Sequence, residues 1–596
     1  MSNELMVGAC TAGLLSALLL VGEQAPDPNR ALLDQGTAAA ALSDIPPAQL
    51  NETIDRYCVR CHSERRLTGN LSLEGFDVAA PREQWEITER VVSKLRANLM
   101  PPPGSNRPAG DTLVALARAL EHSVDTWAEA NPTPGSRGFQ RLNQAEYARA
   151  VRELLGLEID PSGFLPPDAR SANFDNIADA QLLSPTLVTA YLNAAAGVSR
   201  MALGDPSVAA SQTVYRASQQ TSQRDWIEGA PIGSRGGIST THNFPADGTY
   251  VFRVGFAHSL TGEVFARTML REHVEISVDG ERVALLEMDH WLRESDVVGL
   301  YMDTEPIEIR AGSRRVSAVF VKAAEGPVDD LLSPHELTLA DRHVGDAGFG
   351  VELLPHLTTL QLSGPFDAHG VSETDVRARI LTCRPGSPAE ERPCAEEILG
   401  DLMHRAFRGT ATDEDLGGLM SVYQETASNE GFEAGIRVGL QAVLANPKFI
   451  FRMEQPASQG PIVEGVYPIS DIALASRLSF FLWNLPPDQE LLRLAEAGRL
   501  NDDAELERQV RRMIADPRAE ARGTRFASQW LRLHDLDRAV PDQFWFPDFN
   551  EQLTQAMRRE TELFFFSLVQ DDRSYFDLLD ADYTFLNERL AAHYGI

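Results

Sequence analysis

Two cysteines and a histidine in the first part of the chain have types and a spacing that can do chemistry. They stand in the segment Tyr57-Cys58-Val59-Arg60-Cys61-His62. This spacing is the attachment signature of a c-type haem, in which both thiols form thioether bonds to the porphyrin and the histidine ligates the iron. The alternatives are a redox dithiol, half of a zinc site, or chance. Zinc would need a second ligand pair, and apart from Cys10 the remaining cysteines, Cys383 and Cys394, lie more than 300 residues away.

Met100 is the candidate for the second axial ligand of such a haem. It stands in Leu99-Met100-Pro101-Pro102-Pro103-Gly104, after a segment with helical periodicity. A thioether is a soft donor suited to haem iron, and the prolines cannot continue the helix and would stiffen the loop that presents the sulfur. The alternative for a single methionine is packing in the core. The sequence predicts one covalent haem c, with His62 and Met100 as the iron ligands.

Three helices are expected to position these residues. Apolar residues at helical spacing predict a helix that begins near Ala48 and ends at the cysteine motif. A second helix runs from near Trp85 towards Met100, and a third covers 112–130. Residues 49–130 are therefore predicted to form a small class I-like cytochrome c.

Composition and charge limit the class of protein. The chain has 596 residues, which is too long for one core, and its net charge of −32 argues against a nucleic-acid partner. An uncharged apolar run at 5–22 predicts a signal peptide or N-terminal anchor over 1–25, although no basic residue precedes it. A flexible linker is expected over 26–48. We expect a bacterial periplasmic, extracellular or cell-surface protein that touches a membrane only through this segment.

Several blocks of the sequence resemble one family of secreted bacterial proteins. Residues 49–130 resemble the planctomycete-type cytochrome c domain of that family. The blocks 138–147, 165–168 and 173–176 are similar to the helical domain that follows it, which predicts a helical domain of unknown function over 138–205. Asp175 and Asn176 could bind a cation, but short polar residues of this kind more often form turns.

Alternating strands then predict a β-sandwich over 212–325. Residues 250–256 and 274–283 alternate at period two, with a hairpin turn at Asp279-Gly280. This stretch resembles the jelly-roll, carbohydrate-binding-like insert of the same family. The resemblance implies a polysaccharide partner, and loop carboxylates could hold Ca²⁺. The alternative is a spacer sandwich with ordinary Asp-Gly turns. Trp226 and Trp291 are either sugar-stacking platforms or core residues.

The remainder is expected to be a connector over 326–372 and two helical domains, 373–455 and 456–596. In relatives of the resembled family further domains follow. Cys383 and Cys394 form a disulfide candidate, worth about 2–3 kcal/mol in the chain-entropy model, or are two free buried thiols. Six polar residues inside apolar blocks either line a site or make ion pairs and helix caps: Arg477, Asp488, Arg518, Glu560, Asn587 and Glu588.

The sequence thus predicts a multidomain, mainly α chain. It would contain a small helical class I-like cytochrome c, a helical domain, an inserted jelly-roll β-sandwich and a large α-helical C-terminal region. The function predicted is electron transfer by an exported c-type haem protein that serves a redox partner protein within a larger oxidoreductase system. The alternative is an extracellular polysaccharide-binding protein with an accessory cytochrome. No motif for hydrolysis is present, and no catalytic residue is assigned.

Overall fold

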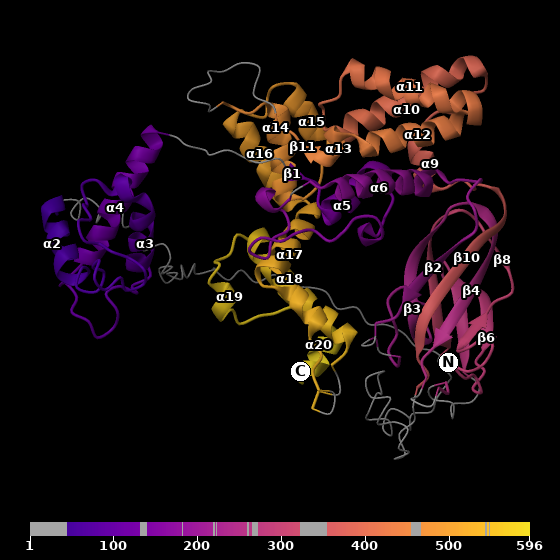
Figure 1. Cartoon of the computed structure of the whole chain (residues 1–596), viewed down its shortest axis with the longest axis horizontal. Coiled ribbons are helices and arrows are strands. Elements are labelled where there is room, and N and C mark those ends of the chain that lie inside the picture. Colours follow the sequence, from indigo (N-terminus) through magenta and orange to yellow (C-terminus); the bar gives the residue numbers. More distant parts are fainter. Residues whose placement is uncertain are drawn as a thin grey trace, which may run out of the picture. The chain divides into compact units, whose positions relative to one another are not determined.

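The computed structural model describes residues 45–131 and 140–596, apart from 182, 219–220, 222, 259–261, 265–271, 322–353, 455–466, 543–544 and 547–548. It forms two compact units, residues 1–136 and 137–596 (Figure 1). The predicted signal peptide or anchor, nearly all of the predicted linker and most of the predicted connector lie outside the described residues. No helix among the described residues is long and apolar enough to cross a bilayer.

The first unit is built from helices with a small apolar core. Its elements are α2 (Pro47–Tyr57), the 3₁₀ turn η3 (Pro81–Gln84), α3 (Trp85–Arg96) and α4 (Thr112–Ala130). Proline occupies the first turn of α2, where its missing N–H is not needed. One buried cluster joins α2, the following loop and α4: Leu50, Ile54, Leu73, Phe76, Val78, Leu116 and Leu120.

A helical body in the second unit is assembled from two separate stretches of chain. Its elements are β1 (Gln140–Arg141), α5 (Gln144–Leu155), η4 (Pro161–Gly163), η5 (Ala178–Ala180) and α6 (Pro185–Leu203), then α9 (Asp375–Ile380), α10 (Pro388–Ala406), α11 (Asp413–Glu430), α12 (Phe432–Ala445), α13 (Pro447–Ile450) and β11 (Phe451–Arg452). Residues from both stretches share one apolar core, and β1 pairs with β11 antiparallel. The two predicted helical domains on either side of the sandwich therefore form one body.

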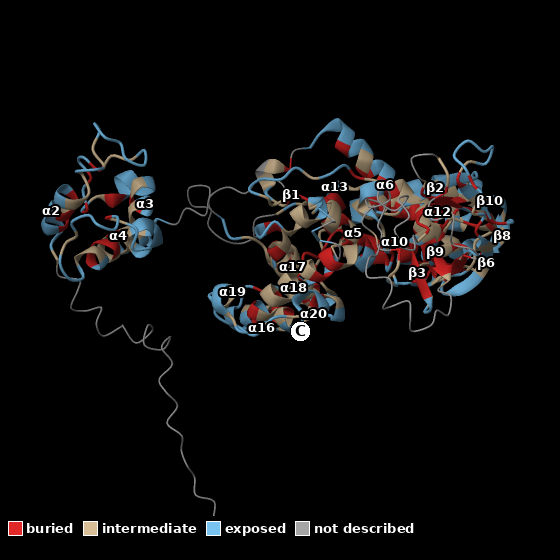
Figure 2. Ribbon diagram, turned by 90° about the horizontal axis from the view of Figure 1, so that it is seen from below, coloured by how far each residue is buried: buried red, intermediate tan, exposed pale blue. Residues whose placement is uncertain are grey.

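The β-sandwich is inserted between α6 and α9 (Figure 1). Its strands are β2 (Ser211–Arg216), β3 (Ser234–Phe244), β4 (Asp247–Phe256), β5 (His273–Val278), β6 (Glu281–Glu287), β7 (Tyr301–Asp303), β8 (Ile307–Ile309), β9 (Gly312–Val321) and β10 (Leu357–Gly370). One antiparallel sheet has the order β2-β10-β4-β7, with β8 also on β4, and the other has the order β3-β9-β5-β6. Buried residues concentrate inside the sandwich and the helical body (Figure 2).

Two predictions about the fold are wrong. The first is that 326–372 is a connector, because 357–370 form β10, which lies between β2 and β4. The second is the fold class, a mainly α chain with a small class I-like cytochrome c. Of the described residues about 47% lie in helices and 17% in strands, so the chain is a mixed α and β multidomain protein. Long antiparallel strands whose backbone groups pair across the sheets account for the difference.

The chain ends in a helical region with a second core. Its elements are α14 (Asp471–Leu482), α15 (Gln489–Glu496), α16 (Asp503–Ala515), α17 (Arg518–Trp530), η6 (Leu533–Arg538), α18 (Glu551–Gln570), α19 (Asp577–Asp580) and α20 (Glu588–Tyr594). Trp483 is fully buried in this core, together with Leu491 and Met513. Side-chain caps at Ser470, Asp488 and Asp502 begin α14, α15 and α16 and satisfy backbone N–H groups there.

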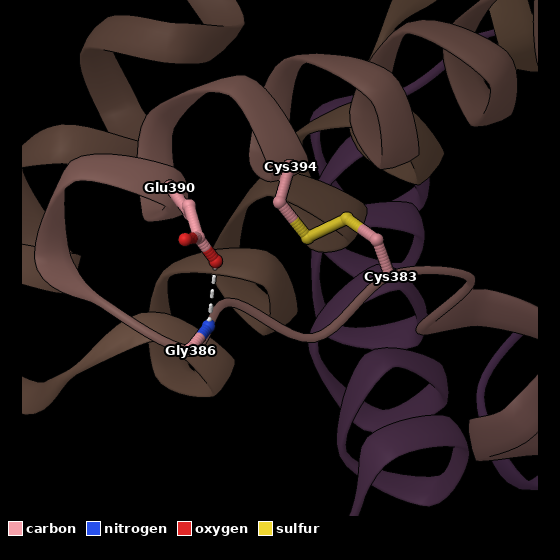
Figure 3. The surroundings of a disulfide bond; sticks show 4 residues. All are labelled: Cys383, Gly386, Glu390 and Cys394. Carbon is pink, nitrogen blue, oxygen red and sulfur yellow. Dashed lines mark hydrogen bonds between the residues drawn. A yellow bond between two sulfur atoms is a disulfide. The ribbon is translucent and has the colours of Figure 1, made fainter.

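In the structure Cys383 and Cys394 are joined by a disulfide (Figure 3). It connects the segment after α9 to the second turn of α10. Within the loop that the bond closes, the Gly386 N–H donates to Glu390 Oε2 at 2.9 Å. The cross-link therefore fixes the start of α10 against the chain that returns from the sandwich.

A histidine in the sandwich predicts a pH-dependent stability. His242 lies on β3, its Nδ1 is 2.8 Å from the Tyr215 hydroxyl, and burial lowers its pKa to about 4. Above pH ~6.5 the ring is neutral in both the folded and unfolded states; below it the unfolded chain takes up the proton first. We expect the free energy of unfolding of the sandwich to fall by about 2–3 kcal/mol between pH ~6.5 and ~4 through this residue.

The measurement for His242 is urea denaturation at pH ~7.5 and ~5, compared between the native chain and His242→Gln. Glutamine keeps an acceptor for the tyrosine but does not titrate. The variant should lose less stability on acidification than the native chain. Equal losses in the two proteins would contradict the prediction.

Candidate functional site

The cysteine motif lies in a tight turn at the end of α2. The Cys58 N–H donates to Ile54 O at 2.8 Å and so continues the helix by one residue. The His62 N–H then donates to Cys58 O at 2.9 Å, and the Leu73 N–H donates to His62 O at 2.7 Å. These backbone bonds fold the motif onto the loop that follows it.

Four of the residues predicted from the sequence line one cavity. Cys58, Cys61, His62 and Met100 contribute to a cavity of about 960 Å³ within the first unit. Aliphatic side chains from all three helices and the intervening loop form part of its wall: Ile54, Leu71, Leu73, Val91, Leu95 and Leu116. The fold therefore brings Met100, 38 positions beyond His62, to the same cavity as the motif.

The two cysteines are separate thiols in unlike surroundings. Cys58 is partly buried and Cys61 is exposed, and no disulfide joins them. Burial, followed by the neighbouring Cys61, raises the pKa of the Cys58 thiol to about 11. Since the thiolate is the nucleophile in disulfide exchange, Cys58 is a poor exchange thiol near neutral pH.

The His62 ring carries a buried polar atom without a partner. Among the described residues, none forms a hydrogen bond with His62 Nδ1. A buried nitrogen of this kind costs free energy unless a bound group or water satisfies it. The cavity therefore has an unsatisfied polar atom at the histidine, while aliphatic side chains form another part of its wall.

Arg107 fixes the loop that presents Met100, and sequence analysis missed it. Its Nε donates to Pro101 O at 2.9 Å, and its Nη1 and Nη2 donate to Asn98 Oδ1 at 2.6 Å and Asn98 O at 3.0 Å. Arg107 also lines the cavity. No local sequence pattern predicts this role of Arg107. Its partners are backbone and amide oxygens six to nine positions earlier, in an irregular segment.

The predicted calcium site is corrected. Among the residues that the structure describes, no group of three or more His, Cys, Asp or Glu side chains could hold a metal ion. The carboxylates of the sandwich hairpin make other contacts. Asp279 accepts the Arg315 N–H at 2.9 Å and pairs with Arg314, while Glu275 pairs with Arg282 at 2.6 Å.

The same finding corrects the predicted haem c cofactor. In the described pocket Cys58, Cys61 and His62 do not form a group that could hold a metal ion. Haem c is therefore not assigned to this chain. That Cys58, Cys61, His62 and Met100 are the residues of a functional site stays a prediction.

Most other polar candidates make structural contacts. Asp175 Oδ1 accepts from Asn143 Nδ2 at 3.1 Å, and Asp175 pairs with Arg525, so it joins helical segments. Asp488 caps α15 and pairs with Arg512 at 2.8 Å. The rest of the set behaves similarly: Arg477 pairs with Glu454, Arg518 with Asp516, Glu560 accepts from Thr584, and Asn587 caps α20, whose first turn contains Glu588.

Comparison with known families identifies parts of the second unit. Three family models match this chain. They are PSD3, a protein of unknown function (DUF1587), at 140–204; PSD5, a protein of unknown function (DUF1595), at 394–454; and PSD4, a protein of unknown function (DUF1592), at 469–596. The search of curated proteins and the search of solved structures found no match. The three matched segments lie in the helical part of the second unit, on either side of the sandwich.

Proposed function

We propose that the first unit is an electron-transfer module of an exported redox system, with the pocket around Cys58, Cys61 and His62 as its redox site. The observation that supports this proposal is the presence of two thiols, an imidazole and a thioether on one cavity of about 960 Å³. A cavity of this size accommodates a cofactor-sized group. An apolar wall controls solvent access, and so the reduction potential of a group held there.

A bound redox group fits the pocket better than a dithiol–disulfide couple. The raised pKa of Cys58 makes its thiolate rare near neutral pH, which disfavours rapid disulfide exchange. A cavity of about 960 Å³ is also larger than a dithiol needs, whereas it accommodates a bound group of cofactor size. Electrons would pass between this group and a partner protein outside the cytoplasm.

The test is to produce the whole chain with export in a bacterial host and to look for a bound redox group by its visible absorbance. We expect the folded chain to carry a group that absorbs visible light. It should be lost in Cys58→Ala and Cys61→Ala. A Cys383→Ala/Cys394→Ala variant, which also lacks two cysteines, should retain it. A native chain with no bound group, or a group retained in both pocket variants, would refute the proposal.

Polysaccharide binding by the sandwich is the second candidate function. The observation that favours it is the exposure of Trp226 and Trp291, whose exposed fractions of 49% and 66% are not those of core residues. Exposed indole rings can stack on sugar rings. Glycan-array binding that is lost in Trp291→Ala, with the fold retained, would support this function.

A further inference from the structure

A second cavity lies in the helical part of the second unit, where all three matched segments meet. Its volume is about 330 Å³. Gln140 and Asn176 come from the PSD3 segment, and Arg452 comes from the end of the PSD5 segment. The PSD4 segment supplies the other lining residues: Leu474, Arg477, Leu478, Phe480, Phe481 and Arg522.

The backbone holds two of these residues in register. Gln140 and Arg452 are direct partners in the antiparallel pairing of β1 and β11. The Gln140 side-chain amide donates to Asn176 O at 3.3 Å, so the loop that contains Asn176 is held at the same place. Asn176, Arg452 and Leu474 lie about 35, 310 and 330 positions after Gln140 in the sequence. The cavity therefore exists only when the helical body is folded.

Arg452 is the buried cation of this cavity. Its side chain is 10% exposed, and its guanidinium carbon lies 4.6 Å from the centroid of the Phe480 ring. Its Nη2 is 3.4 Å from Glu146 Oε1, yet among the described residues none accepts a hydrogen bond from its Nε or Nη2. Two donors of a nearly buried guanidinium are therefore unsatisfied, which is costly unless an acceptor enters the cavity.

Arg522 adds a positive charge that is not part of an ion pair with any described carboxylate. Its Nε donates to Phe481 O at 3.2 Å. Burial lowers the pKa of Arg522, and the positive charges of Arg525 and Arg452 lower it further, whereas the carboxylates of Glu146 and Asp175 oppose this shift. The guanidinium is therefore surrounded by charges of both signs but makes no ion pair of its own among the described residues.

The third arginine is already paired. Arg477 Nε donates to Glu454 Oε1 at 2.6 Å, and a second bond joins the same two side chains. Three arginines thus line the cavity: Arg477 is paired with Glu454, Arg452 lies near Glu146, and Arg522 makes no ion pair with a described carboxylate.

We propose that this cavity binds a small organic anion, whose carboxylate lies between Arg452 and Arg522 and whose apolar part packs on Phe480, Phe481 and Leu478. A guanidinium offers parallel N–H donors that match the two oxygens of a carboxylate. The aromatic and aliphatic walls favour a ligand with an apolar body over a bare inorganic ion. The site is independent of the redox pocket in the first unit.

The test is calorimetric titration of the whole chain with benzoate, with benzyl alcohol and inorganic phosphate as comparison probes. We expect saturable benzoate binding and no binding of the neutral alcohol. Arg522→Gln should weaken benzoate binding by about tenfold or more, because one charged hydrogen-bonding group is lost. Arg511→Gln removes the same charge from a side chain that is 78% exposed and paired with Glu507, so it should change the affinity by less than about twofold.

Two further outcomes decide the proposal. Arg522→Lys keeps the charge but loses the planar fork, and it should also weaken binding if the carboxylate is held by two parallel bonds. No benzoate binding, equal affinity in Arg522→Gln, or phosphate binding at least as tight as benzoate would overturn the proposal.

Discussion

Replacing Arg141 with methionine is expected to destabilise the helical body of the second unit by about 3–5 kcal/mol. The Arg141 and Asp168 side chains are 6% and 7% exposed, and Nη1 donates to Asp168 Oδ1 at 2.7 Å. The same nitrogen lies 3.1 Å from the Tyr191 hydroxyl. Methionine fills much of the volume but leaves the Asp168 carboxylate buried without its cation, and this uncompensated charge causes the loss.

The measurement is urea denaturation monitored by far-ultraviolet circular dichroism, which gives the free energy of unfolding of the helical body. The control is Arg152→Met on the neighbouring helix, where the arginine is about half exposed and 3.6 Å from Glu158. An exposed pair of this kind contributes at most about 1 kcal/mol. Equal effects of the two substitutions would show that the buried pair does not hold the segments together.

Trp483→Ala should lower the free energy of unfolding of the C-terminal helical region by about 3–5 kcal/mol. The side chain is fully buried, and its Nε1 donates to Met513 O at 2.8 Å. The guanidinium carbon of Arg518 lies 3.6 Å from the ring centroid, so the substitution also removes a cation–π contact. A cavity, an unpaired carbonyl and an uncovered arginine would result from one change.

Phe481→Ala is the matched control for Trp483, because it removes an aromatic ring two positions earlier that is 67% exposed. Phe481→Ala should lower the free energy of unfolding by much less than Trp483→Ala, because it removes little apolar area from the core. Thermal unfolding of the two variants gives the comparison. A tryptophan variant as stable as the phenylalanine variant would contradict the packing described for this core.

Local patterns predicted the elements around the cysteine motif well. The helix expected from near Ala48 is α2 (Pro47–Tyr57), and the one expected over 112–130 is α4 (Thr112–Ala130). Helical periodicity is a property of neighbouring residues, so it is visible in the sequence. Met100 could also be placed near the motif, because a single helix and loop separate them.

Local sequence patterns did not predict the features that depend on residues far apart in the chain. Strand β10 was missed because its pairing with β4 shifts register between Ser363 and Phe366 and again before Gly370, which breaks the period-two alternation. The shared core on either side of the sandwich and the Arg452–Arg522 cavity also depend on long-range packing. No spacing in the sequence relates residues 70 positions apart on different elements.

Electron transfer by the first unit, as we propose it, depends on a group held in the pocket around Cys58 and Cys61. The most direct measurement is a reductive titration of the exported whole chain, with a Cys58→Ala/Cys61→Ala chain in parallel. We expect reversible electron uptake in the native chain, monitored as a change in visible absorbance, and none in the double variant. Uptake that is the same in both chains, or that is absent from the native chain, would contradict it.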